Sequence, residues 1–447
     1  MSGHGARPTV KEVGTSVLGL VVVIAVAILY RGLTESGGHA AGAAPLFALG
    51  FLSIVGVVAG QFAAVVGLPR LTGYLIAGII VGPQVAGFIS TGDVKALGLV
   101  NALALALIGL AAGAEVTLPI LARIWKSLSI AAVVHIVIVV GSCAAAFYAA
   151  SSYLPFLAGY EPGVVAAVAV LWGVFAFTRS PSVTLAVLAD TGARGPLSEW
   201  ALGLVVVLDV LVLPIFTGAL TFARSQIEGV AFEPGVFLEL SHELWESILA
   251  GIAGGLLLGF VLRLVDGSRV LIVVVVAYLV TALCAYLRYD TIFVFVVMGF
   301  VAVNVVGTGE QLLGAAERTS GAVFVVFFAL AGAKLDLEAL RVWWTVAIGL
   351  AVARAVATVV ACQIAHVVAK DTPVVRRYGW MALISQAGVT IGLATLVSDL
   401  LPEVGRALAT LVIAVVGIHE LVGPVLFKLG LARAQELPRA NDRGATT

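Results

Sequence analysis

Long runs of apolar residues, separated by short polar connections, make up almost the whole chain. A helix that spans a membrane needs about 20 mostly apolar residues. Fourteen runs approach that length, at about 16–31, 45–66, 70–90, 97–118, 127–150, 163–189, 197–222, 243–265, 269–287, 290–307, 320–336, 342–366, 378–399 and 404–427. The pattern therefore predicts an all-α polytopic membrane protein with about fourteen transmembrane segments.

Composition strengthens the membrane prediction and narrows the function. Of the 447 residues, 61% are hydrophobic and 11% are charged, and the mean hydropathy is +1.13. Soluble domains contain about 25% charged residues, so no water-soluble fold would bury this much apolar surface. The formal net charge of zero argues against a nucleic-acid partner. No connection is long enough for a soluble domain, and neither a His-rich metal cluster nor a Ser-His-Asp order is evident. We therefore expect a non-enzymatic protein without a cofactor, whose chemistry takes place within the lipid bilayer.

Lysine and arginine in the connections predict the orientation. If the N-terminus is inside, the inner connections and termini hold sixteen of these residues and the outer connections hold seven. The other two, Arg179 and Arg354, fall within apolar segments. This asymmetry favours two cytoplasmic termini and supports an even number of spans.

Two of the predicted segments contain polar interruptions. The first carries "FTRSPSVT" at 177–184, where Pro181 removes a backbone donor and is surrounded by Thr178, Arg179, Ser180, Ser182 and Thr184. The second carries "ISQAGVT" at 384–390, with Ser385, Gln386, Gly388 and Thr390. Irregular backbone at membrane depth is tolerated where it lines a cavity or is buried in protein. Paired broken segments in two halves of a chain indicate the substrate site of a transporter.

The spacing around these interruptions indicates an inverted repeat. Each broken segment is followed by one apolar span that contains an acid, Asp209 after the first and Glu420 after the second. The fifth to seventh segments therefore resemble the twelfth to fourteenth. The two units start seven segments apart, an odd number, so they would enter the membrane from opposite sides.

Five stretches resemble the cation:proton antiporter-2 family of sodium/hydrogen exchanger-like proteins. They are "GLPRLTGYLIAGIIVGP" (67–83), "NALALALIGLAAGAEV" (101–116), "RSPSVTLAVLADTGARGPLSE" (179–199), "VFFALAGAKLDL" (326–337) and "QAGVTIGLATLV" (386–397). The likeness extends from about residue 45 to 430, in the family's order. It implies a sodium/proton-antiporter fold with two crossed broken helices, elevator-type alternating access and exchange of Na⁺ or K⁺ for H⁺.

The resemblance also implies an organisation of the chain and of its assembly. It suggests a cytoplasmic N-terminus (1–15), a scaffold or dimerisation part with the start of the first repeat (16–120) and a core transport domain in two halves (121–222 and 341–430). A second scaffold part (243–340) and a cytoplasmic tail (431–447) complete the division. We expect a homodimer in a bacterial-type inner (plasma) membrane.

Site residues follow from the same resemblance, position by position. Asp209 matches the family's essential carboxylate, and Arg354 matches the basic residue in the span before the second break. Thr178 and Ser180 match polar positions at the first break, while Ser385, Gln386 and Gly388 lie at the second. Glu420 matches an acid of the last span, where it is either a ligand or a structural partner of an arginine. Two residues depart from the family pattern: Leu208 stands where a second polar carrier is common, and Arg179 stands where small or polar residues are usual.

The chemistry of Asp209 suits exchange, because a desolvated carboxylate can hold either a proton or a metal ion. Hydroxyl groups of Thr178 and Ser180 and freed carbonyl oxygens would complete an alkali-metal site. Arginine does not lose its proton in proteins, so Arg354 is interpreted as a fixed counter-charge. Asp209 and Glu420 balance Arg179 and Arg354, which predicts electroneutral exchange.

Alternatives remain open at this point. Asp209 could be a structural acid paired with Arg354. Arg179 beside the site would repel a cation or neutralise Asp209, so the same fold could instead carry an anionic solute with Asp209 as the proton-coupling group. A third alternative is a different class of protein, either a membrane sensor that transports nothing or a membrane enzyme.

Overall fold

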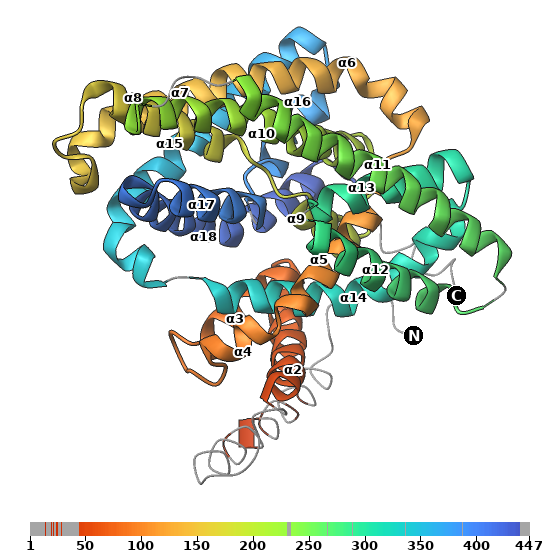
Figure 1. Ribbon diagram of the computed structural model, residues 1–447. Helices are drawn as coiled ribbons and strands as arrows, with labels where there is room; N and C mark the ends of the chain where they lie inside the picture. The colour runs from red at the N-terminus through yellow and green to blue at the C-terminus, as the bar shows by residue number, and fades with distance from the viewer. Residues whose placement is uncertain are drawn as a thin grey trace.

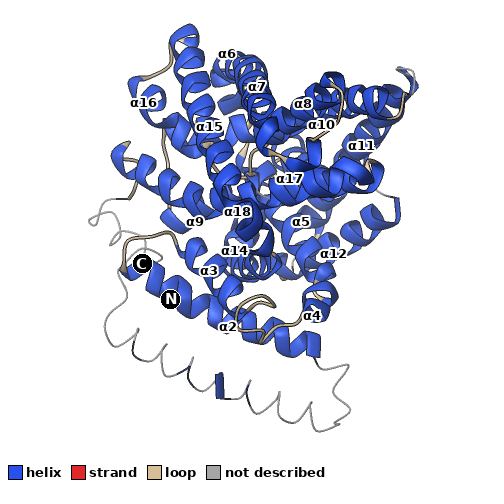
Figure 2. Ribbon diagram, turned by 90° about the vertical axis from the view of Figure 1, so that its left-hand side faces the viewer, coloured by secondary structure: helices blue, strands red, loops and turns tan. Residues whose placement is uncertain are grey.

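The computed structural model describes residues 44–229, 234–265, 267–287, 289–335, 337–386 and 388–438, together with isolated positions within 14–28. The predicted first span (16–31), the predicted N-terminus (1–15) and the end of the predicted tail (439–447) lie essentially outside the described residues. Within the described part of the chain every regular element is a helix, and Figure 2 contains no strand.

The helices follow one another with short connections. Those before the first broken pair are α2 (Ala44–Val65), α3 (Arg70–Val81), α4 (Thr91–Ala96), α5 (Gly98–Glu115), α6 (Leu118–His135), a π-helix (Ile136–Val140) and α7 (Gly141–Ala150). Two single 3-10 turns (Ser151–Tyr153 and Pro155–Leu157) lead to α8 (Pro162–Phe177), α9 (Pro181–Thr191), α10 (Pro196–Ile227), α11 (Pro234–Leu264) and α12 (Arg269–Leu287). The remainder are α13 (Thr291–Val301), a π-helix (Ala302–Val306), α14 (Gly309–Lys334), α15 (Leu337–Ala369), α16 (Pro373–Ala382), α17 (Gly388–Leu400) and α18 (Pro402–Arg433).

Nine helical stretches among the described residues are long and apolar enough to cross a membrane, and a tenth qualifies if the bent pair 309–316 and 318–334 counts as one span. Shorter apolar helices cover 70–81, 291–306 and 389–400. Every predicted segment from 45–66 onward thus coincides with a helix or a broken helix pair. The prediction of an all-helical membrane protein is confirmed.

The predicted span at 70–90 is wrong in its extent. The helix α3 ends at Val81, because Gly82 takes an extended conformation and Pro83 cannot continue the helical hydrogen bonding. The next helix, α4, has only 6 residues and begins with a capping box between Ser90 and Asp93. Apolar composition alone did not reveal this stop.

The helices gather into two groups that differ in their partners. In one, a large shared core is formed by α6, α7, α8, α9, α10, α15, α16, α17 and α18. In the other, α3 packs against α2 and α14, while α5 and α11 pack against α13. Figure 1 shows α17 and α18 below α15, and α3 and α14 directly below α18.

Glycine allows very close approach within the second group. A Cβ atom at Gly113 of α5 would collide with the carbonyl oxygen of Val296 on α13, and one at Gly78 of α3 would collide with that of Ala329 on α14. Small residues at such contacts are typical of membrane helices, which gain stability from backbone packing.

The two broken pairs occupy corresponding places in the first group. The pair α8–α9 is followed by α10, and the pair α16–α17 is followed by α18. Both following helices are 32 residues long, start with proline and carry an internal proline (Pro214 and Pro424) shortly after the acid. The two helices that carry the acids are therefore alike in length and in the position of their prolines, as expected for the repeat that the sequence indicates.

Candidate functional site: two crossed helix breaks

The first break is an extended segment, Thr178–Ser180, between α8 and α9. Residues before a proline avoid the helical region, so Pro181 forces the chain to extend and then starts α9. The Ser180 hydroxyl accepts a hydrogen bond from the Val183 amide at 3.2 Å and so caps the new helix. The break is therefore built into the sequence rather than imposed by packing.

The second break, at 383–386, crosses the first in direct contact. The Gln386 Nε2 group donates to the Phe175 carbonyl at 2.7 Å and to the Thr178 Oγ1 atom at 3.1 Å. The hydroxyl oxygens of Thr178 and Thr390 lie 2.6 Å apart. All of these side chains are buried. The predicted crossing of two broken helices is confirmed.

Arg354 of α15 joins the two breaks. Its Nε donates to the Ala176 carbonyl at 2.8 Å, its NH2 group to the Thr178 carbonyl at 3.0 Å and its NH1 group to the Ile384 carbonyl at 2.7 Å. These carbonyls belong to the C-terminal ends of α8 and α16, which carry partial negative charge. The fully buried guanidinium thus compensates the partial negative charge at the ends of both helices.

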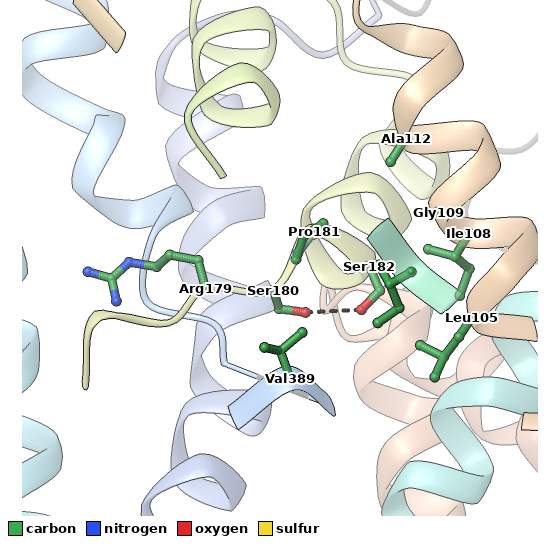
Figure 3. Close-up of a pocket in the computed structure, with 10 residues that line it drawn as sticks. Leu105, Ile108, Gly109, Ala112, Arg179, Ser180, Pro181, Ser182 and Val389 are labelled. Carbon is green, nitrogen blue, oxygen red and sulfur yellow. Dashed lines mark hydrogen bonds between the residues drawn. The ribbon is translucent and has the colours of Figure 1, made fainter. Parts of the chain in front are cut away.

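Arg179 takes a similar position from the other side of the break. Its NH1 group donates to the carbonyls of Ala176 and Thr178 at 2.8 and 2.9 Å, and its NH2 group donates to Thr358 Oγ1 on α15 at 3.2 Å. In Figure 3 the side chain points away from the residues of α5, and it forms no ion pair with Asp209. The α8 carbonyls and Thr358 thus hold the guanidinium of Arg179, while other atoms of the residue line the cavity.

A small cavity lies where the first break faces α5 and α13. Its walls are formed by Leu105, Ile108, Gly109, Ala112, Arg179, Ser180, Pro181, Ser182, Ile292 and Val389 (Figure 3). The hydroxyl oxygens of Ser180 and Ser182 are 3.0 Å apart in its wall. The cavity therefore lies between the two groups of helices, at the level of the first break.

Asp209 lies on α10 and has an unusual environment. The residue is half-buried, yet its Oδ1 atom is buried and has no hydrogen-bond partner in the described chain. Among the described residues no arginine pairs with it, so the alternative of a structural pair with Arg354 is not observed. An unpaired buried carboxylate oxygen is costly to maintain unless a proton or a cation binds to it.

Comparison with known proteins agrees with this geometry. A family model described as the transmembrane sodium/hydrogen exchanger matches residues 50–429. The chain belongs to the sodium/hydrogen exchanger family. A search of curated proteins gave no match.

Solved structures support the fold. A structure of the sodium proton antiporter MjNhaP1 from Methanocaldococcus jannaschii at pH 8 matches with a TM-score of 0.63 and 15% identity, over 88% of this chain and 98% of that one. An electron-microscopy map of the same antiporter matches with a TM-score of 0.69 and 14% identity, over 87% and 96% of the two chains. This member of the exchanger family is therefore an integral membrane protein with the fold of that antiporter.

Within this exchanger-family site, Glu420 is separate from the arginines. It is buried on α18 and forms no hydrogen bond or ion pair with Arg179 or Arg354. Its neighbour His419 approaches Gln386 Oε1 at 2.8 Å through Nδ1 and so anchors the second break. Ser385 packs against Gly423, where a Cβ atom would collide with its hydroxyl.

The structure brings some predicted site residues together and leaves others apart. Thr178, Gln386 and Arg354 form one hydrogen-bonded cluster, and Gly388 starts α17 directly beyond it. No hydrogen bond connects Asp209 to Thr178 or Ser180 in this state, since their hydroxyls bond within the breaks. Thr358, whose hydroxyl accepts a hydrogen bond from Arg179, was not predicted as a site residue.

Proposed function

We propose that this chain is a secondary active transporter that exchanges a monovalent cation, Na⁺ or K⁺, for H⁺. The observation that carries the proposal is the unpartnered, buried Oδ1 atom of Asp209, on the helix that follows the first of two crossed breaks. Such an oxygen is satisfied by a proton or by an alkali cation, and the two compete because they use the same carboxylate.

Alternating access would be of the elevator type. In this proposal the group formed by 121–222 and 341–430 is the moving core, and 16–120 and 243–340 form the scaffold. The cavity between Ser180 of the core and Ile292 of the scaffold supports this division, since a sliding boundary there would open the first break to either side.

Exchange would be electroneutral. Arg354 and Arg179 keep a fixed charge and donate to backbone carbonyls, so they are engaged in holding the breaks and do not carry protons. With Leu208 before Asp209, no second acid stands next to the carrier. One proton would therefore move for each monovalent cation.

The anionic-solute alternative receives no support from the arginines. An anion site would require guanidinium groups facing the cavity, whereas both groups donate to carbonyl oxygens of the breaks. A homodimer in a bacterial-type plasma membrane, with both termini cytoplasmic, remains part of the proposal from the charge asymmetry and the family resemblance.

The proposal is tested in proteoliposomes that contain a pH-sensitive dye. After an acid-inside gradient is imposed, Na⁺, K⁺, Li⁺ or choline is added outside. We expect at least one alkali cation, but not choline, to collapse the gradient, at a rate that an imposed membrane potential does not change. A rate that follows the potential would contradict electroneutrality, and an undisturbed gradient with every cation would favour a sensor or an anion carrier.

A further inference from the structure

The chain passes from the proposed scaffold into the proposed core at two connections. The first joins α5 to α6, and the second joins α14 to α15. Helices α6 and α15 lead into the two core halves and pack against each other. Hinges in proteins are typically a few residues at the ends of elements, so these two connections are where a moving core would bend away from its scaffold.

The first connection is clamped by Asn304 of the scaffold. Its Oδ1 atom accepts a hydrogen bond at 2.7 Å from the amide of Leu118, the first residue of α6. Its Nδ2 group donates at 2.9 Å to the carbonyl of Val116, directly after α5. Within the described residues the Thr117 side chain does not cap α6, so the scaffold supplies the cap. Asn304 itself lies in the π-helix at 302–306, an irregularity that is frequent at functional sites.

The second connection is held in the same way by Gln84, which follows α3 in the scaffold. Its Oε1 atom accepts a hydrogen bond at 2.6 Å from the amide of Leu337, the first residue of α15, and another at 3.3 Å from that of Glu338. The first amides of a helix have no partner within the helix, so an acceptor from elsewhere satisfies them. Two side-chain amides of the scaffold thus hold the first peptides of two corresponding helices.

The two holding points lie far apart. In Figure 1 the connection into α15 is at the left of the view, and the connection into α6 is at its right. The inverted repeat that the sequence indicates would place them at opposite surfaces of the membrane. Two fixed points leave a rigid body one freedom, rotation about the line that joins them. The core surface would then slide past the scaffold while the starts of α6 and α15 stay in place.

We propose that Asn304 and Gln84 are the pivot residues of alternating access, which keep the first peptides of α6 and α15 attached to the scaffold while the rest of the core turns. The inference rests on the proposed exchange function with a moving core, and adds to it the two points that do not move. Both are positioning residues, because they act through the helices that they hold and not through contact with the transported ion.

The test joins each pivot contact covalently and measures cation-driven proton flux in proteoliposomes. The pairs are Asn304→Cys with Leu118→Cys, and Gln84→Cys with Leu337→Cys. Each is linked by oxidation or by a short bifunctional thiol reagent until neither cysteine reacts with a maleimide. A contact that persists through the cycle tolerates a link, so we expect kcat to stay within about twofold of that of the reduced protein for both pairs.

A second measurement separates a pivot from a plain helix cap. Gln84→Glu keeps the acceptor oxygen, whereas Gln84→Met has a similar shape and removes it. We expect kcat to fall about two- to tenfold in Gln84→Met, because a core that is no longer held can shift without turning, and to be preserved in Gln84→Glu. KM for the cation should stay the same in both. A lower melting temperature of Gln84→Met with an unchanged kcat would make Gln84 a helix cap only and overturn its role.

The matched control is the pair Arg70→Cys and Asp190→Cys, which links α3 to α9 across the same boundary but away from both connections. This link should stop exchange. If a linked pivot pair also stops exchange, and reduction restores it, the contact belongs to one state only and the inference is overturned. If the wild type exchanges no cation at all, the proposed function itself fails. If the wild type exchanges and the control link has no effect, the moving core fails, and the pivots with it.

Discussion

At the scale of single residues, the site depends on one guanidinium that serves two helices. Arg354 donates to three carbonyl oxygens, two in the first break and one in the second. Buried carbonyls without a donor cost about 1–3 kcal/mol each. The geometry therefore requires arginine, whose planar group presents several donors at fixed angles.

Arg354→Lys tests this requirement. The lysine ammonium is a single point and cannot reach all three carbonyls. Arg179 still donates to those of Ala176 and Thr178, so the Ile384 carbonyl is the one that loses its donor, at a cost of about 1–3 kcal/mol. We expect a clearly lower melting temperature in detergent and at least a tenfold slower exchange. Arg406→Lys, at an exposed position of α18, is the control and should change neither. Equal melting temperatures for the two variants would contradict the role given to Arg354.

Several residue roles could be predicted from the sequence, and others could not. Thr178, Gln386 and Arg354 stood out because polar groups are rare in apolar segments, and they do meet. The direction in which the Arg179 side chain points could not be predicted, because it depends on the positions of the free carbonyl oxygens at the end of α8.

At the scale of elements, the crossing is held by side chains that belong to different helices. The hydroxyls of Thr178 and Thr390 and the amide of Gln386 bond across the two breaks. Bonds within each helix could not fix the angle between the pairs. The crossing therefore depends on a few buried polar contacts, whose loss should loosen both breaks together.

Thr178→Val is the corresponding prediction. Valine has a similar shape but leaves Gln386 and Thr390 with one partner fewer, which should cost about 1–3 kcal/mol. We expect a lower melting temperature and slower exchange. Thr395→Val on α17 removes a hydroxyl that bonds to its own helix, at the Ile391 carbonyl, and should have little effect. The prediction fails if Thr178→Val is as stable and as active as the control.

Element boundaries were less predictable than element types. The breaks at 178–180 and 383–386 were evident from proline and polar residues within apolar runs. The early end of α3 was not, because the residues after Gly82 remain fairly apolar. Apolar composition indicates that a segment is buried or in lipid, but hydrogen bonding and proline decide where a helix ends.

At the scale of the whole molecule, polar contacts join the two groups of helices at one end of the proposed boundary. Asp190 at the end of α9 accepts a hydrogen bond from the Arg70 amide of α3 at 3.0 Å, and the two side chains lie 3.7 Å apart. Lys428 of α18 donates to the Leu68 carbonyl at 2.9 Å. If the core slides along the scaffold, these contacts must break in each cycle.

A reversible crosslink tests that movement. The pair Arg70→Cys and Asp190→Cys, joined by oxidation or by a short thiol reagent, should stop exchange, and reduction should restore it. The pair Arg224→Cys and Glu228→Cys, at the C-terminal end of α10, is the control and should exchange equally in both forms. The cysteines at 143, 284 and 362 are buried and free in both proteins. Unchanged exchange in the crosslinked first pair would contradict a moving boundary at this place.

The central claim is that Asp209 alone alternates between proton and cation. The most direct measurement is cation-triggered proton flux in proteoliposomes of wild type and Asp209→Asn, at matched melting temperature and matched protein content. We predict flux with an alkali cation in the wild type and no flux above that of empty vesicles in Asp209→Asn. The reason is that the uncharged asparagine amide takes up neither the proton nor the cation. Flux that persists in folded Asp209→Asn would contradict the account.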